Sequence, residues 1–155
     1  HCEPSYQLLQ RKDLDLTIVT RKPGTEIGQL LRQEKMVWAQ AAGFALQEQP
    51  SLPLAMFNSD CFCREWACNA LDTMERDYRV AYTSPSLSAI MAVVGAGLAI
   101  TAQLESLIPA NMQIIGSEHG LPTMPSASIV LLRNPQIQTP ITDCLAEYIA
   151  EGFRL

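Results

Sequence analysis

Short polar side chains occupy the places where predicted strands are followed by predicted helices. Asn58, Ser59 and Asp60 lie between an apolar run and a helical pattern, and Thr83 and Ser84 lie at a second such junction. Side chains of these types cap helix starts. The unpaired N–H groups of a helix start, together with nearby hydroxyls, also bind polar or anionic small molecules. Capping alone explains any one of these residues, but their repetition favours a ligand site.

The chain has five cysteines, and three of them, Cys61, Cys63 and Cys68, lie close together. A zinc site would need paired C-x-x-C spacing or nearby histidines, and both histidines are far away in the sequence, so we expect no metal. Cys61 and Cys68 would lie about 10 Å apart along a helix, which is beyond disulfide reach. Cysteines in helices are most often small buried residues. A thiol-based redox sensor stays open as an alternative, because a cysteine near a helix start can have a lowered pKa.

No group of residues has the types and spacing that catalysis requires. His119 and Glu118 are neighbours in a loop rich in glycine and proline, where adjacent side chains rarely face one site. No nucleophile motif accompanies them. We therefore expect neither an enzyme nor a cofactor.

The segment from Arg79 to Gln103 positions one of the polar junctions. Its apolar spacing predicts a strand at 80–82, a helix that Ser84 caps and Pro85 begins, and a second strand at 98–101. Two strands joined by a crossover helix are normally parallel. Ligands bind at the carboxyl ends of such strands. This places candidate ligand contacts at Thr83, at Ser84 and, after Ile100, at Thr101.

The remaining elements follow from the same periodicities. Strands are predicted at 14–20, 34–41, 54–57, 112–115 and 129–133, and helical segments at 61–74 and 102–108. Thr139 followed by Pro140 opens a closing amphipathic helix. Its larger apolar residues, which are predicted to point inward, are Ile141, Leu145, Tyr148 and Ile149.

Two stretches carry a family resemblance. Val93–Ile100 resembles the V-x-x-G-x-G-[IL] turn of the effector-binding domain of LysR-type transcriptional regulators, with Ala99 where a second glycine is usual. Leu14–Thr20, which reads LDLTIVT, is similar to the LDLAI strand of that family. Two further departures are Leu104, where a proline is usual, and a turn at Leu8–Asp13 that is shorter than in the family.

The resemblance implies an α/β fold of the periplasmic-binding-protein type 2 class. In that fold, two Rossmann-like subdomains are joined by two crossing strands. The expected division is residues 1–41 plus 127–155 for subdomain I and residues 42–126 for subdomain II. A small molecule would bind in the cleft between them and bias an open-to-closed equilibrium.

The resemblance also implies which residues line this cleft. By position, Ser5 and the junction before residue 61 match places where relatives contact effectors, and Thr20 closes a strand at the cleft edge. Asp60 counts against an anionic ligand unless its carboxylate is turned away or paired. The expected effector-binding residues are Ser5, Thr20, Asn58, Ser59, Asp60, Thr83, Ser84 and Thr101.

Charge and composition limit the partners. A net charge of −5 without a Lys/Arg cluster argues against DNA binding by this chain itself. No apolar run is long enough to span a bilayer, so no membrane partner is expected. The odd cysteine count suits a reducing cytosol.

The family implies a cytoplasmic homodimer or tetramer that senses a small-molecule effector. It would contact DNA only through a helix-turn-helix domain that is not in this sequence. His1 and Cys2 look like the end of a strand, so the chain is expected to be truncated at its start. The alternative from another class is a solute-binding receptor of the same fold.

Overall fold

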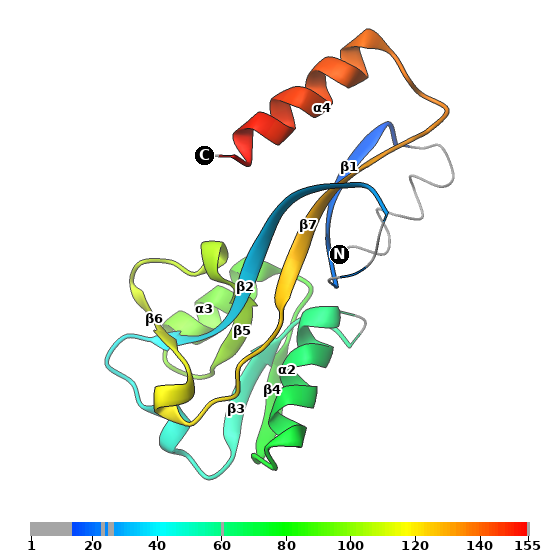
Figure 1. The fold of residues 1–155 in the computed structure, drawn as a ribbon. Helices are drawn as coiled ribbons and strands as arrows, with labels where there is room; N and C mark the ends of the chain where they lie inside the picture. Colours follow the sequence, from blue (N-terminus) through cyan, green and yellow to red (C-terminus); the bar gives the residue numbers. More distant parts are fainter. Residues whose placement is uncertain (1–13, 23, 25–26, 60, 155) are drawn as a thin grey trace. The chain divides into compact units, whose positions relative to one another are not determined.

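The computed structural model describes residues 14–22, 24, 27–59 and 61–154. The chain forms two compact units (Figure 1): His1–Glu34 with Ser126–Leu155, called unit 1 below, and Lys35–Pro125, called unit 2. The sequence placed the first boundary after Ala41, whereas the structure divides inside a single long strand, β2 (Gln29–Ala41). The predicted strand at His1 and Cys2 and the helix at Ser5 lie outside the described residues.

The parallel part of unit 2 contains β3 (Leu52–Met56) and β4 (Tyr78–Thr83), joined by α2 (Phe62–Thr73). The chain continues through α3 (Leu87–Gly95) to Ile100, which forms a parallel bridge to Leu54 on the other edge of β3. The Ile100 N–H donates to the Pro53 carbonyl at 2.8 Å. The segments before and after α3 therefore both run parallel to β3, so the predicted parallel crossover is confirmed.

The antiparallel part of unit 2 is organised by β2. It pairs with β5 (Thr101–Leu104) and with β6 (Met112–Ile115). The predicted helical segment at 102–108 is therefore wrong: residues 101–104 form strand, and only η2 (Glu105–Leu107) makes a single helical turn. Pairing with β2 supplies the backbone hydrogen bonds that an isolated apolar stretch would have sought within a helix.

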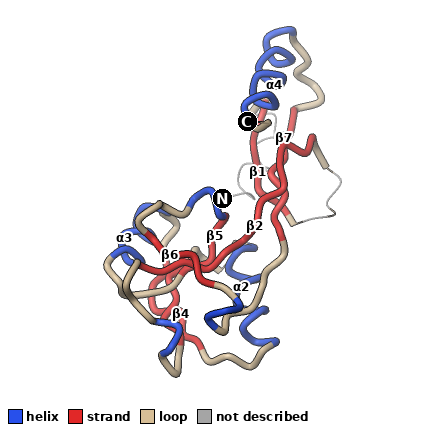
Figure 2. Tube along the Cα trace, turned by 60° about the vertical axis from the view of Figure 1, so that its left-hand side comes forward, coloured by secondary structure: helices blue, strands red, loops and turns tan. Residues whose placement is uncertain are grey.

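Two helices cover the sheet of unit 2 on opposite sides of β3 and β4 (Figure 2). All five residues of β3 are buried, as expected for a strand that is covered on both faces. On one face Ala55 packs with Ile90 and Val94 of α3. The residues that α2 buries are Cys63, Ala67 and Leu71.

The start of α3 differs from the prediction by two residues. Ser86 is the N-cap, and its hydroxyl accepts a hydrogen bond from the Ala89 N–H at 3.4 Å. The Ser84 hydroxyl instead accepts from the Ser86 N–H at 3.1 Å. This local turn satisfies the backbone before the helix begins, so Pro85 stays outside the helix. The predicted end near Gly95 is confirmed, and Gly97 then adopts φ 77°.

Unit 1 contains β1 (Leu16–Arg21) paired antiparallel with β7 (Ser126–Arg133), followed by α4 (Pro140–Gly152). Thr139 caps α4 in a reciprocal arrangement: its hydroxyl accepts from the Thr142 N–H at 3.2 Å, and the Thr142 hydroxyl accepts from the Thr139 N–H at 3.0 Å. The predicted start of this helix is confirmed.

The predicted inward face of α4 is wrong for Ile141, Leu145 and Tyr148, while Ile149 is half-buried. Ile141 and Tyr148 are 80% and 76% exposed, and Leu145 is also exposed. The buried residues of the helix are the small ones: Thr142, Ala146 and Ala150. Hydrophobic periodicity ranks residues by apolar size, so it did not identify the small residues as the buried side of this helix.

Across the described parts of the chain, the helices are too short or too polar to cross a bilayer.

Candidate functional site

The carboxyl ends of β3 and β4 lie side by side. Met56 and Thr83, the last residues of the two strands, are register partners. The Ser84 N–H donates to the Met56 carbonyl at 3.2 Å, which holds the two exits together. The chain after β3 therefore leaves the sheet at the same edge as the chain after β4.

Four of the predicted residues meet at this edge, and we call them the strand-end site: Asn58, Ser59, Thr83 and Ser84. Asn58, Ser59 and Thr83 are exposed, and Ser84 is half-buried. Their side chains supply hydroxyl and amide groups that can donate to or accept from a ligand. The repetition seen in the sequence thus corresponds to proximity in space.

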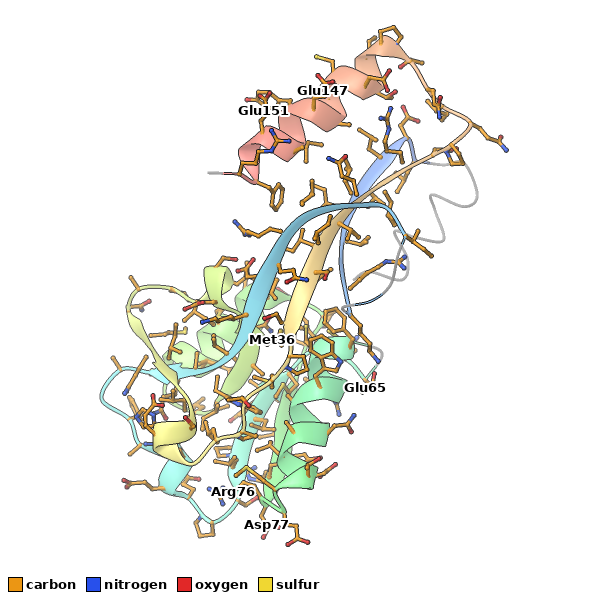
Figure 3. All side chains as sticks on the ribbon, in the orientation of Figure 1. Met36, Glu65, Arg76, Asp77, Glu147 and Glu151 are labelled. Carbon is orange, nitrogen blue, oxygen red and sulfur yellow. The ribbon has the colours of Figure 1, made fainter. Side chains whose placement is uncertain are left out.

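The N-terminus of α2 adds backbone donors to the same edge. Cys61 is the N-cap residue, and its N–H donates to the Asn58 carbonyl at 3.1 Å. At the other end of the helix, Arg76 (Figure 3) donates to the carbonyls of Gln47, Gln49 and Pro50 at 2.9, 2.6 and 2.8 Å. This anchoring fixes the helix, so that the partial positive charge of its N-terminus stays beside the strand-end site.

Arg64 belongs to the same edge, and sequence reasoning missed it. Its Nη1 donates to the Phe57 carbonyl at 3.0 Å and lies 3.5 Å from the Thr83 hydroxyl oxygen, so it links the two strand exits. A cation in the first turn of a helix is electrostatically disfavoured, because the helix N-terminus is itself positive. This misplaced charge was the signal in the sequence that could have identified Arg64.

Thr101 is the first residue of β5 and does not lie at the carboxyl ends of β3 and β4. It is fully buried opposite Ala39, and its hydroxyl has no hydrogen-bond partner among the described residues. Gln103, two residues later, is 2% exposed, and its Nε2 also lacks a partner within the described chain. Ile100 and Leu54 are partners in a parallel bridge. Three residues further along each segment come Gln103 and Phe57, so Gln103 lies at the level where β3 ends. Sequence reasoning missed it because that stretch was predicted to be helical.

The remaining predicted residues belong to unit 1 or lie outside the described residues. Thr20 belongs to unit 1, where it pairs with Ile129 on β7. Ser5 and Asp60 lie outside the described residues.

Cys61 and Cys63 form a pair of thiols in the first turn of α2. A hydrogen bond from the Cys63 side chain lowers the pKa of Cys61 to about 6, aided by the backbone N–H groups of Cys63 and Arg64 and opposed by burial. Cys61 is half-buried and Cys63 is buried. The described cysteines, which also include Cys68 and Cys144, form no disulfides with one another.

A separate hollow of about 420 Å³ lies in unit 1. It contains none of the predicted site residues, and its polar wall includes the ion pair between Arg133 and Asp143. Among its lining residues, Glu147 and Glu151 project from α4 (Figure 3). This wall carries both positive and negative side chains and none of the predicted effector-binding residues. We therefore do not count the hollow as part of the strand-end site.

Comparison with known proteins places this geometry in a family. Residues 3–154 match the LysR substrate binding domain. The HTH-type transcriptional regulator DgdR of Burkholderia cepacia is 30% identical over 151 residues, which cover 96% of this chain and 51% of that protein. The chain spans about half the length of the curated relatives it matches.

Solved structures show the same fold. The regulatory domain of CcmR from Synechocystis PCC6803, in complex with 2-PG, superposes with a TM-score of 0.72 at 19% identity, covering 99% of this chain and 80% of that one. The effector binding domain of QuiR, in complex with shikimate, gives a TM-score of 0.67 at 12% identity, covering 98% and 78%. The predicted α/β fold of the periplasmic-binding-protein type 2 class is confirmed by these neighbours. With nearly its whole length matched, the chain belongs to the family of LysR substrate-binding domains.

Proposed function

We propose that this chain is the effector-binding regulatory domain of a DNA-binding transcriptional regulator, and that its effector contacts the strand-end site. Its curated relatives are transcriptional regulators about twice as long as the chain. The net charge of −5 disfavours DNA contact by this half. DNA binding is therefore assigned to a helix-turn-helix domain outside this sequence, in a cytoplasmic homo-oligomer that performs no catalysis.

The observation that carries the site assignment is the side-by-side exit of two parallel strands beside a helix N-terminus. Exposed hydroxyls, backbone donors and the Arg64 guanidinium all lie at that edge. Gln103 adds a buried donor at the same level that lacks a partner among the described residues. Two proteins of the same fold, CcmR and QuiR, hold 2-PG and shikimate. A small polar ligand with oxygen acceptors suits this set of donors best.

Effector binding would act by shifting a conformational equilibrium. A ligand shifts such an equilibrium only by its difference in affinity for the two states. The predicted cleft between the two subdomains, with Ser5, Thr20 and Asp60 completing its lining, stays a prediction. The same holds for the dimer or tetramer through which closure would alter the spacing of DNA-binding domains.

A thermal-shift screen of small organic acids, with shikimate among them, tests the site on this chain. Binding to the native state at a hundredfold excess over Kd stabilises it by about 2.7 kcal/mol. A compound that binds as proposed loses its effect when Ser59→Trp or Thr83→Trp fills the edge. Arg64→Ala weakens an acidic ligand more than a neutral one.

Thr73→Trp is the matched control. Thr73 is exposed near the far end of α2, where its hydroxyl donates to the Asn69 carbonyl at 2.8 Å. The proposal predicts that this variant keeps the full ligand-induced shift. A hit that survives both edge substitutions would move the effector site elsewhere in the molecule.

A further inference from the structure

We propose that Ile141, Leu145 and Tyr148 of α4, called the α4 stripe below, form the docking surface for a helical segment of the same protein that lies outside residues 1–155. This interaction surface goes beyond effector sensing and does not depend on it. The proposal rests on the exposure, the spacing and the charged border of the stripe, and on the length of related domains.

The α4 stripe presents a large apolar surface to solvent. Ile141 is 80% exposed, Leu145 is 47% exposed and Tyr148 is 76% exposed. If a fully exposed large side chain contributes roughly 200 Å², these fractions amount to about 400 Å² of apolar surface. A contiguous exposed patch of this size on a soluble protein marks an interaction surface, whereas single exposed apolar residues are ordinary.

The spacing of the α4 stripe suits a helix as its occupant. Positions i, i+4 and i+7 lie in one row along a helix, and Gly152 continues this row four residues after Tyr148. A Cβ on Gly152 would meet nothing within 4 Å outside its own stretch of helix. Rows with alternating steps of four and three residues are those along which a second helix packs. The glycine leaves room for a close approach at the end of the row.

Acidic side chains border the stripe on one side. Glu147 and Glu151 are exposed, lie one helical turn apart and project from α4 (Figure 3). On the opposite side of the stripe, Ile149 is half-buried, so the apolar surface continues there toward the buried face of the helix. The occupant should therefore be an amphipathic helix that carries Lys or Arg along the flank facing Glu147 and Glu151.

Area and charge both disfavour a second copy of this chain as the occupant. About 400 Å² is half of the roughly 800 Å² that each partner buries in a standard stable interface. A second α4 packed antiparallel would also bring its own Glu147 and Glu151 to the same flank, where like charges repel. A segment of the same polypeptide does not lose the translational and rotational freedom that two separate molecules lose on association, so the smaller area suffices.

Related domains contain the length of chain that such a segment needs. Nearly all of this chain matches the CcmR regulatory domain and the QuiR effector binding domain, but it covers only 80% and 78% of those chains. About a fifth of each therefore has no counterpart in residues 1–155. The curated relatives are about twice as long as this chain. A protein of that length would supply a helix as long as α4.

The first test is photo-cross-linking in the full-length protein with p-benzoylphenylalanine in place of Tyr148. After irradiation and digestion, mass spectrometry should find the label joined to a Lys- or Arg-containing peptide from outside residues 1–155 of the same molecule. The control places the same label at Met74, the exposed C-cap residue of α2, and should give no such peptide. A product that joins two polypeptides, or the absence of any peptide from outside residues 1–155, would overturn the proposal.

The second test compares Leu145→Ser with Met74→Ser in the full-length protein. The two side chains are matched in this chain, where Leu145 is 47% exposed and Met74 is 45% exposed. Leu145→Ser should lower Tm by about 4 °C, because its side chain is covered in the full-length protein, whereas Met74→Ser should lower it by less than about 2 °C. Equal shifts would contradict the docking surface. Neither residue belongs to the strand-end site, so this result leaves the effector proposal to the ligand screen.

Discussion

The described strands of the two units are buried to different extents. In unit 2 the central strand β3 is buried along its whole length, and helices cover both of its faces. In unit 1, β7 buries six of its eight residues, whereas β1 buries one of its six, and Ile18 of β1 is 44% exposed. Three large apolar residues of α4, Ile141, Leu145 and Tyr148, are also exposed.

This difference explains why the candidate site is well defined in unit 2. A site needs side chains that are held by rigid elements. The parallel pair of β3 and β4 and the anchored helix α2 provide them, and they position Arg64 and the strand-end hydroxyls together. In unit 1, β1 buries only Val19 among its six residues, and sparse burial of this kind is typical of regions that open more easily.

Removing buried volume from each unit gives the largest expected effect. Leu54→Ala in β3, where the side chain is fully buried, should lower the free energy of unfolding by about 3 kcal/mol. Val19→Ala in β1 should cost roughly 1.5 kcal/mol, because it removes less surface. Urea denaturation monitored by circular dichroism measures both. Equal losses would contradict the difference between the units.

The helix caps of the two units provide a sharper comparison. Thr139→Ala removes from α4 the hydroxyl that accepts from the Thr142 N–H at 3.2 Å, but keeps the bond from the Thr139 N–H to the Thr142 hydroxyl, and should cost about 1 kcal/mol. Ser86→Ala removes a bond of 3.4 Å from α3 and should cost about 0.5 kcal/mol. Thermal unfolding can rank the two variants. Ser88→Ala, an exposed change in the first turn of α3, serves as the control and should be neutral. A larger loss for Ser86→Ala than for Thr139→Ala would reverse the expected order.

The pH dependence of stability isolates one residue of unit 2. The folded pKa of Cys61, about 6, lies below its ordinary value of 9.0, so the folded chain releases this proton more readily than the unfolded chain. The resulting stabilisation is complete above pH 9 and is lost as the pH falls through 6. Because the thiol is partly exposed to solvent, we expect about 1 kcal/mol across this window.

Urea midpoints for wild type and Cys61→Ser, measured between pH 6 and pH 8.5, test this expectation. The serine variant should gain less stability with rising pH. Cys144→Ser in unit 1 should keep the wild-type slope. Parallel slopes for wild type and Cys61→Ser would show that the thiol contributes nothing to folding.

The smallest effect is expected on the outer face of α4. Tyr148→Ser should change stability by less than about 0.5 kcal/mol, because the side chain is 76% exposed. Ala146→Leu, on the buried face of the same helix, should cost about 2 kcal/mol by overpacking. Denaturant midpoints of the two variants decide between this orientation and the one expected from hydrophobic periodicity. A destabilising Tyr148→Ser with a tolerated Ala146→Leu would favour the latter.

Local sequence signals predicted most elements of the fold. Alternation and apolar runs located β1, β3, β4, β6 and β7, because those strands carry residues that favour burial. Thr139 and Pro140 located the start of α4, since capping is a local interaction. The errors arose where a partner distant in the sequence decided the outcome. Residues 102–104 became strand by pairing with β2, and α4 turned its small residues inward.

The candidate site divides in the same way. Asn58, Ser59, Thr83 and Ser84 were identified from their types and their places after strands. Arg64 and Gln103 were not, because their relation to the site runs through the register of β3 with β4 and with Ile100.

By itself the sequence determined the family, the parallel crossover and the hydroxyl-bearing junctions, because each depends on residues close together along the chain. Only the tertiary structure decided that Arg64 links the two strand exits, that Gln103 is buried at their level, and that Thr101 lies within the sheet. The physical reason is that strand pairing brings together residues dozens of positions apart, and the order in which strands pair is set by the packing of the whole core.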